Sequence, residues 1–203
     1  MVVSDSELAR ANRLRVLEQG TSPEEALAFF DGCGIVRMEE MLGCWKGSGV
    51  PTGHPFDGLL EALGWHGKRF GSPDETHPLV FEGAAGLFSV NPALLPVSLA
   101  VRFNRLVRTP PMPVIGRRLV WMARTSKPRA RLRMMEYRGV VTATMSYDAL
   151  PINDHFRRVD ADTMIGVMDF RSIDRPFLFV LRHEPCEDSR QRASRRGRLR
   201  GMS

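Results

Sequence analysis

The chain has few cysteines and lacks long apolar runs. Three of its 203 residues are cysteine, Cys33, Cys44 and Cys186, at unrelated spacings and without a CxxC pair. This odd number argues against a disulfide framework and a zinc ribbon, and favours a reducing compartment. No stretch approaches the ~18 apolar residues of a membrane-spanning helix. Residues 1–20 carry no cationic leader followed by an apolar core. We therefore expect a cytoplasmic protein with no transmembrane segment.

Motifs of common catalytic sites are also missing. The sequence contains no GxSxG elbow, no P-loop, no dinucleotide fingerprint and no HExxH zinc spacing. No metal site is predicted from it, and no catalytic motif identifies the chain as an enzyme.

The positive charge of the chain is concentrated at one end. Lys plus Arg number 29 against 23 Asp plus Glu, but six of the 29 are arginines between Arg190 and Arg200, where there is no acid. The rest of the chain is neutral overall, with a basic stretch at 102–138. We expect residues 185–203 to form a disordered basic tail. The tail leaves open an association with an anionic polymer or a membrane, although no nucleic-acid-binding motif accompanies the charge.

Helical signals come first along the chain. Residues 4–19 have apolar residues roughly at helical spacing, and Ser22-Pro23 begins a second helix that should stop near Gly32. A short helix is predicted within 56–63 and a strand at 77–81. Residues 93–108 are ambiguous, with one helical reading.

The second half of the chain is typical of a strand meander. Short runs separated by turn signals predict strands at 117–124, 131–137, 139–147, 152–159, 164–170 and 177–183. Within 140–147, apolar and polar residues alternate, as in a strand with one buried face. Together these runs predict an α+β, mainly β fold: an antiparallel barrel or curved sheet with short N-terminal helices.

A segment rich in glycine and tryptophan is the sharpest motif. Gly43-Cys44-Trp45-Lys46-Gly47-Ser48-Gly49 is followed by Pro51 to Pro55, by Gly64-Trp65-His66-Gly67-Lys68-Arg69-Phe70 and by His77-Pro78-Leu79. Glycines beside a strand tryptophan permit close backbone approach, so that the indole can plug a barrel end.

With these motifs the chain resembles the GXWXG-domain family of bacterial proteins. Its downstream half resembles the domain of unknown function 4334, through Tyr147-Asp148, Leu150 to Ile152, Asp154 to Arg157, Gly166 to Asp169 and Pro176-Phe177. The two resemblances cover roughly residues 20–183 and imply no particular activity. The predicted organisation is N-terminal helices at 1–37 and one barrel-like domain at 38–184, made of a GXWXG part (38–95) and the meander (96–184), before the tail.

The motif is also similar to that of calycin-type barrels, including lipocalins and fatty-acid-binding proteins, and above all nitrobindin, a heme-binding barrel. Gly43, Trp45, Gly47 and Gly49 match the nitrobindin motif. This resemblance implies heme as a cofactor, with His183 on the last strand as the counterpart of the proximal histidine. The insert from Pro51 to about Val90 departs from the nitrobindin pattern.

Our leading hypothesis is a calycin-like barrel that binds a small hydrophobic or amphipathic ligand, fatty-acid-like or heme-like. Lys46 and Lys68, two of only three lysines, could meet its carboxylate or phosphate. A homodimer is left open. The candidate ligand-binding residues are Trp45, Lys46, Thr52, His54, Trp65, Lys68, His77, Tyr147, Phe179 and His183.

An enzyme is the alternative hypothesis. His54 and His77 each precede a proline, which favours an extended backbone and could hold the imidazole at a loop edge. With Asp57 they could act in acid/base catalysis. The same residues could instead stabilise turns, and the sequence leaves both interpretations open.

Overall fold

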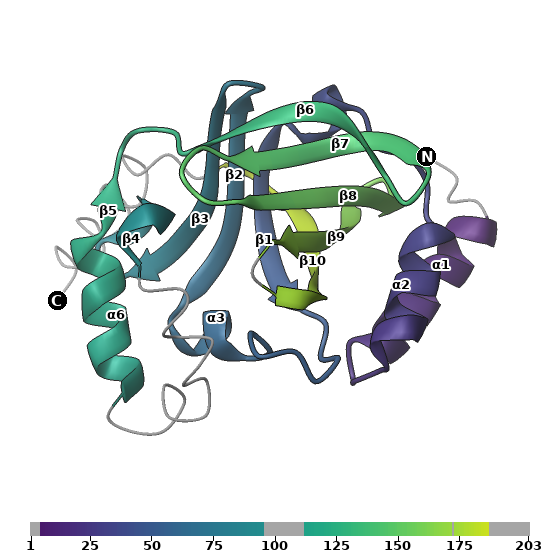
Figure 1. The fold of residues 1–203 in the computed structure, drawn as a ribbon, viewed down its shortest axis with the longest axis horizontal. Coiled ribbons are helices and arrows are strands. Elements are labelled where there is room, and N and C mark those ends of the chain that lie inside the picture. The colour runs from purple at the N-terminus through teal and green to yellow at the C-terminus, as the bar shows by residue number, and fades with distance from the viewer. Residues whose placement is uncertain (1–4, 96–111, 172, 187–203) are drawn as a thin grey trace, which may run out of the picture.

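The computed structural model describes residues 5–95, 112–171 and 173–186, and its centre is an antiparallel sheet that closes into a barrel (Figure 1). Its strands are β1 (Gly43–Gly49), β2 (Trp65–Ser72), β3 (Glu75–Gly83), β4 (Gly86–Val90), β5 (Arg124–Thr125), β6 (Ala130–Tyr137), β7 (Val140–Tyr147), β8 (Ile152–Asp160), β9 (Thr163–Phe170) and β10 (Ile173–Glu184). The barrel order is β2-β1-β10-β9-β8-β7-β6-β3, and β3 pairs again with β2. Strands β4 and β5 continue outward from β3. The predicted fold class is confirmed.

Two strand pairings close the barrel, β1 with β10 and β3 with β6. Strands β1 and β10 pair from Cys44 to Gly49 of β1, and Trp45 lies opposite His183. Strands β3 and β6 meet only at Thr76 and Ala130, where the Leu132 amide donates to the Pro73 carbonyl at 2.7 Å. The second pairing is therefore the weaker one.

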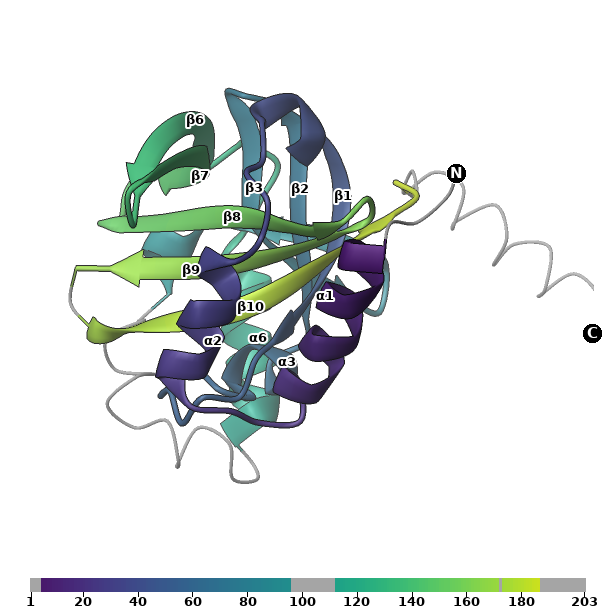
Figure 2. The same ribbon diagram turned by 90° about the vertical axis from the view of Figure 1, so that its right-hand side faces the viewer.

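Apolar side chains pack on both faces of the sheet. Inside the barrel lie Trp45, Phe70, Phe156 and Phe179, each at most 2% exposed. Outside, helices α1 (Asp5–Leu17) and α2 (Pro23–Asp31) cover β8, β9 and β10 (Figure 2). The predicted N-terminal helices are confirmed, and the Ser22 hydroxyl caps α2 by accepting from the Glu25 amide at 3.1 Å.

Two motif glycines are required by close contacts. A β-carbon at position 47 would lie 2.2 Å from the Trp65 ring, and one at position 67 would lie 1.9 Å from the Trp45 carbonyl oxygen. Gly67 also has a φ of +155° at a bulge of β2. These two glycines therefore allow the two tryptophan-bearing strands to pack closely together.

The remaining helical segments are η1 (Met38–Met41), α3 (Leu59–Ala62), η2 (Pro92–Leu94) and α6 (Met112–Met122). The strand predicted at 117–124 is wrong, because most of this run lies in α6. A short apolar run does not distinguish a buried strand from a helix, and Pro113 is compatible with a first helical turn. Most of the ambiguous stretch at 93–108 lies outside the described residues, as does nearly all of the predicted tail.

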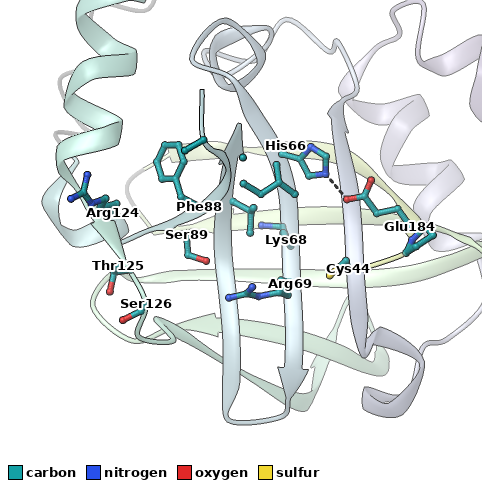
Figure 3. Close-up of a pocket in the computed structure, with 15 residues that line it drawn as sticks. Cys44, His66, Lys68, Arg69, Phe88, Ser89, Arg124, Thr125, Ser126 and Glu184 are labelled. Atoms are coloured by element: carbon teal, nitrogen blue, oxygen red, sulfur yellow. Dashed lines mark hydrogen bonds and ion pairs between the residues drawn. The ribbon is translucent and has the colours of Figure 1, made fainter. Parts of the chain in front are cut away.

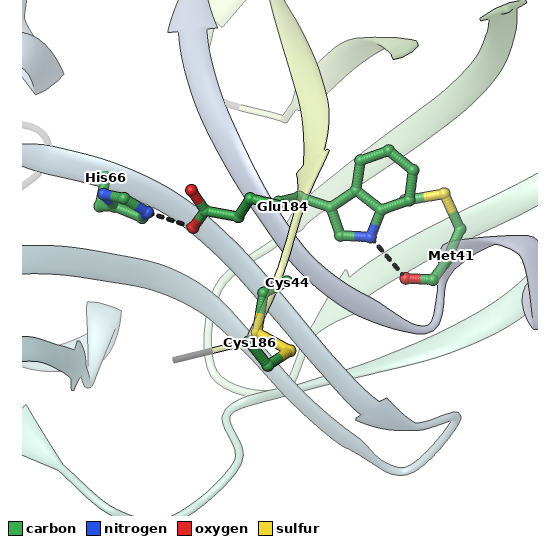
Figure 4. Close-up of a disulfide and its surroundings, with 6 residues drawn as sticks. Met41, Cys44, His66, Glu184 and Cys186 are labelled. Atoms are coloured by element: carbon green, nitrogen blue, oxygen red, sulfur yellow. Dashed lines mark hydrogen bonds and ion pairs between the residues drawn. A yellow bond between two sulfur atoms is a disulfide. The ribbon is translucent and has the colours of Figure 1, made fainter. Parts of the chain in front are cut away.

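The prediction that the cysteines form no disulfide is also wrong. Cys44 and Cys186 are bonded, with their α-carbons 5.2 Å apart (Figure 4). They are 142 residues apart in sequence, but β1 and β10 are neighbours and Cys44 lies opposite Glu184. The spacing of the cysteines gave no hint of this contact, because barrel closure creates it. Cys33 is the free cysteine, and burial raises the pKa of its thiol to about 12.

Candidate functional site

A charged network lies inside the barrel. The Lys68 ammonium on β2 donates to Asp154 Oδ2 on β8 at 2.7 Å and to the Pro78 carbonyl at 3.1 Å. The Tyr147 hydroxyl on β7 lies 3.4 Å from the same carboxylate oxygen. The side chains of Lys68 and Asp154 are only 3% and 1% exposed. Aromatic rings surround this ion pair, with the Phe179 centroid 4.9 Å from Lys68 Nζ.

One carboxylate oxygen of this network lacks a hydrogen-bond partner among the described residues. This oxygen is Asp154 Oδ1, and it is buried. Burial raises the pKa of Asp154, while the charge of Lys68 acts in the opposite direction. Burial, together with the Asp154 charge, raises the pKa of Tyr147 well above its usual value. A buried charged group costs free energy unless it is paired and hydrogen-bonded. The Lys68–Asp154 pair therefore distinguishes this interior from a purely apolar core.

A cleft of about 640 Å³ lies on the other side of β2 (Figure 3). Its walls come from β1 to β5 and from Glu184 and Pro185 at the end of β10. Cys44 and Arg69 are opposite each other, and the adjacent pair, Trp45 and Lys68, has its side chains in the buried interior. Because side chains alternate along strands, the cleft is on the outer face of the barrel. Its volume is within the roughly 300–1,000 Å³ of small-molecule sites.

The cleft combines an apolar floor with cations. Val80, Leu87 and Phe88 supply the apolar surface. Arg69 and Arg124 are exposed cations in the lining, and neither side chain forms a hydrogen bond or ion pair with another described residue. The Arg124 guanidinium instead lies 4.0 Å from the Trp121 ring centroid. The cleft is therefore suited to a molecule with one apolar and one anionic part.

Hydroxyls and one ion pair complete the lining. Ser89, Thr125 and Ser126 line the wall formed by β4 and β5 (Figure 3). Glu184, the acid in the lining, pairs with His66 (Figure 4). The Glu184 carboxylate therefore contacts His66 and not Arg69 or Arg124.

The structure distributes the predicted ligand-binding residues over several places. Lys68, Tyr147 and Phe179 meet at the interior network, and Lys68 also lines the cleft. Lys46 is exposed on β1, and Thr52 is buried in the following loop.

The two motif tryptophans are bonded within their own surroundings. The Trp45 indole donates to the Met41 carbonyl at 2.8 Å and the Trp65 indole to the Gly67 carbonyl at 2.9 Å. Both rings are buried. Both indole N–H groups are therefore already hydrogen-bonded within the protein and are not available to a ligand.

The three residues proposed for acid/base catalysis occupy two elements. In the loop after β1, Asp57 Oδ2 accepts from the Thr52 and His54 amides, each at 2.9 Å. His54 Nδ1 accepts from the Phe56 amide and Nε2 donates to the Arg175 carbonyl. His77 instead lies on β3 opposite Arg69, and burial with that cation lowers its pKa to about 4. These contacts give His54 and Asp57 a turn-stabilising role.

The surroundings of His183 do not fit a heme site. His183 lies opposite Trp45 in the strand register, but its side chain is exposed at the barrel end. The ring lies against the buried Trp45 indole, and a β-carbon at Gly43 would come within 2.8 Å of Nε2. In the described ranges, no group of three or more His, Cys, Asp or Glu could hold a metal ion.

The residues that sequence reasoning missed are Asp154, Arg69 and Arg124. Asp154 and Arg69 both stand inside motif segments, and Arg69 directly follows Lys68. Asp154 offered no signal of its own, because its strand, INDHFRRVD, contains several other polar and charged residues. Arg124 offered no signal, because the turn after α6 brings it to the cleft.

The fold and the site define a closed antiparallel barrel with an external cleft of ligand size. Residues 28–86 match the GXWXG protein family, and residues 128–183 match a domain of unknown function, DUF4334. The chain therefore contains one segment that matches each of the two families, as the sequence motifs predicted. The two segments contribute β1 to β3 and β6 to β10 of the same barrel.

A solved structure is similar over nearly the whole fold. The crystal structure of a protein from Thermomonospora curvata has 27% sequence identity to this chain and a TM-score of 0.65, covering 89% of this chain and 99% of that one. No curated protein matches the chain.

Proposed function

We propose that this barrel protein binds a small amphipathic anion in the cleft over β2 to β5. The observation that carries the proposal is that Arg69 and Arg124 share one ligand-sized cleft with an apolar floor. Each guanidinium presents a planar set of donors that matches a carboxylate or phosphate. The apolar part of the ligand would lie on Val80, Leu87 and Phe88.

This proposal refines the ligand class expected from the motif. A fatty-acid-like molecule satisfies both the apolar and the anionic requirement, whereas a heme-like ligand has no support at His183. The proposed location differs from a pocket centred on Trp45, because that indole is only 2% exposed.

Competition among molecules with one alkyl chain and different head groups tests the proposal. A fluorescent fatty acid is bound to the purified full-length protein and displaced with dodecanoate, dodecyl phosphate or dodecanol. We expect the two anions to displace it at concentrations at least about tenfold lower than the alcohol, since hydrogen bonds to charged groups contribute roughly 1.5–3 kcal/mol. Equal potency of acid and alcohol, or no bound probe in native mass spectrometry, would contradict the proposal.

Other predictions concern location and partners. Within the described ranges, no helix has the length and apolar character needed to cross a membrane. A cytoplasmic location and a homodimer stay predictions, and the location has lost its support from unpaired cysteines, because Cys44 and Cys186 are bonded. Association through the arginines at 190–200 falls outside the described residues.

A further inference from the structure

Helix α6 presents an unusual amount of apolar surface to solvent. Val114, Ile115, Leu119, Trp121 and Met122 are between 47% and 72% exposed. At 100° per residue, Val114, Ile115, Trp121 and Met122 lie on the side of the helix away from Gly116 and Val120. Arg118 lies between them, and Leu119 lies at the edge of this side, next to Gly116. Gly116 packs against Leu63 near α3, and Val120 is 2% exposed. One side of α6 therefore attaches to the protein, and the other carries exposed apolar side chains around the exposed Arg118.

Cations accompany this face. Arg117 and Arg118 lie on α6 and are exposed, and Arg124 follows the helix with its guanidinium over the Trp121 ring. The helix contains no acidic residue. Exposed aromatic and aliphatic side chains next to arginines are the features of helices that lie in the interface of an anionic membrane.

We propose that α6 is a docking surface for an anionic lipid membrane. Val114, Trp121 and Met122 would enter the boundary between head groups and acyl chains, while Arg117 and Arg118 would contact lipid phosphates. Charge complementarity favours this occupant over a second copy of the chain, which would bring the same arginines against one another. The inference does not depend on what the cleft binds.

Tryptophan fluorescence of the full chain with lipid vesicles tests the proposal. Trp121 is 52% exposed, whereas Trp45 and Trp65 are 2% and 6% exposed. Trp121 should therefore dominate quenching by acrylamide in the free protein. With vesicles of equal phosphatidylcholine and phosphatidylglycerol we expect a blue shift of the emission and protection from acrylamide. Vesicles of phosphatidylcholine alone should bind at least about tenfold more weakly, because several arginines contribute to the attraction.

A matched pair of variants separates the helix from the rest of the surface. Leu119→Glu on α6 and Val141→Glu on β7 each place a carboxylate at an apolar position that is 48% or 51% exposed. Leu119→Glu should weaken vesicle binding at least about tenfold, and Val141→Glu should leave it unchanged. The arginines at 190–200 are retained in both variants, so vesicle attraction through them would not distinguish the two.

Three outcomes would overturn the proposal. The first is vesicle binding that Leu119→Glu leaves unchanged. The second is a Trp121 signal already protected from acrylamide in the free protein, which would mean that the chain itself covers the face. The third is a dimer in analytical ultracentrifugation that Leu119→Glu dissociates without any vesicle binding by the wild type.

Discussion

Position 47 requires glycine because the Trp65 ring lies over it. Trp65 occupies the space of its missing side chain, so even a methyl group would push the indole or separate β1 from β2. The sequence motif identified this glycine but not the ring, since the contact joins two strands, β1 and β2, whose register the sequence does not give. Lys68 was equally recognisable, as a rare lysine, while its partner Asp154 was not.

Gly47→Ala should therefore be strongly destabilising. We expect the free energy of unfolding to fall by roughly 3 kcal/mol, at the upper end for an overpacked core. Chemical denaturation measures this change. Gly32→Ala is the control, because Gly32 has a φ of −79° and its nearest atom would be 3.6 Å away. A similar loss in both variants would show that Trp65 is not the cause.

His155 should make the protein sensitive to acid. The side chain is 3% exposed, and burial lowers its pKa from 6.5 to about 4. Since the folded-state pKa is depressed, the unfolded state takes up the proton first as the pH falls. The stability contribution is then present above pH 6.5 and is lost as the pH falls toward 4, by at most about 3 kcal/mol.

Unfolding free energies between pH 7.5 and 4.5 check this linkage. His155→Gln should remove the His155 part of the pH dependence, even though it also loses the stacking on Tyr137. His183→Gln, at an exposed histidine, should keep the wild-type slope. The linkage is refuted by parallel pH profiles for the wild type and His155→Gln.

Among the elements, the strands of the meander were predictable and α6 was not. Alternation in 140–147 matches β7, whose Thr142 and Thr144 are nevertheless buried because Thr142 donates to the Phe156 carbonyl and Thr144 bonds to His155. Polar residues on a strand therefore did not mark a solvent face here. Helix α6 was mistaken for a strand because its apolar residues face solvent as well as protein, and their spacing then carries no single period.

The disulfide between β1 and the end of β10 should stabilise the barrel closure. Because it links residues 142 apart, it restricts the unfolded chain, and we expect its loss to cost about 2–4 kcal/mol. Denaturation of the wild type with and without a reducing phosphine measures this contribution. Cys186→Ser should have the stability of the reduced wild type and should not respond to the phosphine. Free thiols at both positions in oxidised protein would contradict the assigned bond.

At the scale of the whole molecule, two sequence families make one barrel. The GXWXG segment supplies β1, β2 and β3, and the DUF4334 segment supplies β6 to β10, so that each provides the pairing partners of the other at β1–β10 and β3–β6. The barrel could be predicted from strand spacing and the tryptophan motif. The cleft could not, because Arg69, Ser89 and Arg124 come together only when β4 pairs with β3 and β5 with β4.

The affinity of dodecanoate for paired arginine variants tests the central proposal most directly. By titration calorimetry, Arg69→Gln should bind dodecanoate about ten- to a hundredfold more weakly than the wild type, because a charged hydrogen bond of roughly 1.5–3 kcal/mol is lost. Arg131→Gln should bind as the wild type does, since Arg131 is exposed on β6, is paired with Asp148 and does not line the cleft. Equal affinity of Arg69→Gln and the wild type would contradict ligand binding in this cleft.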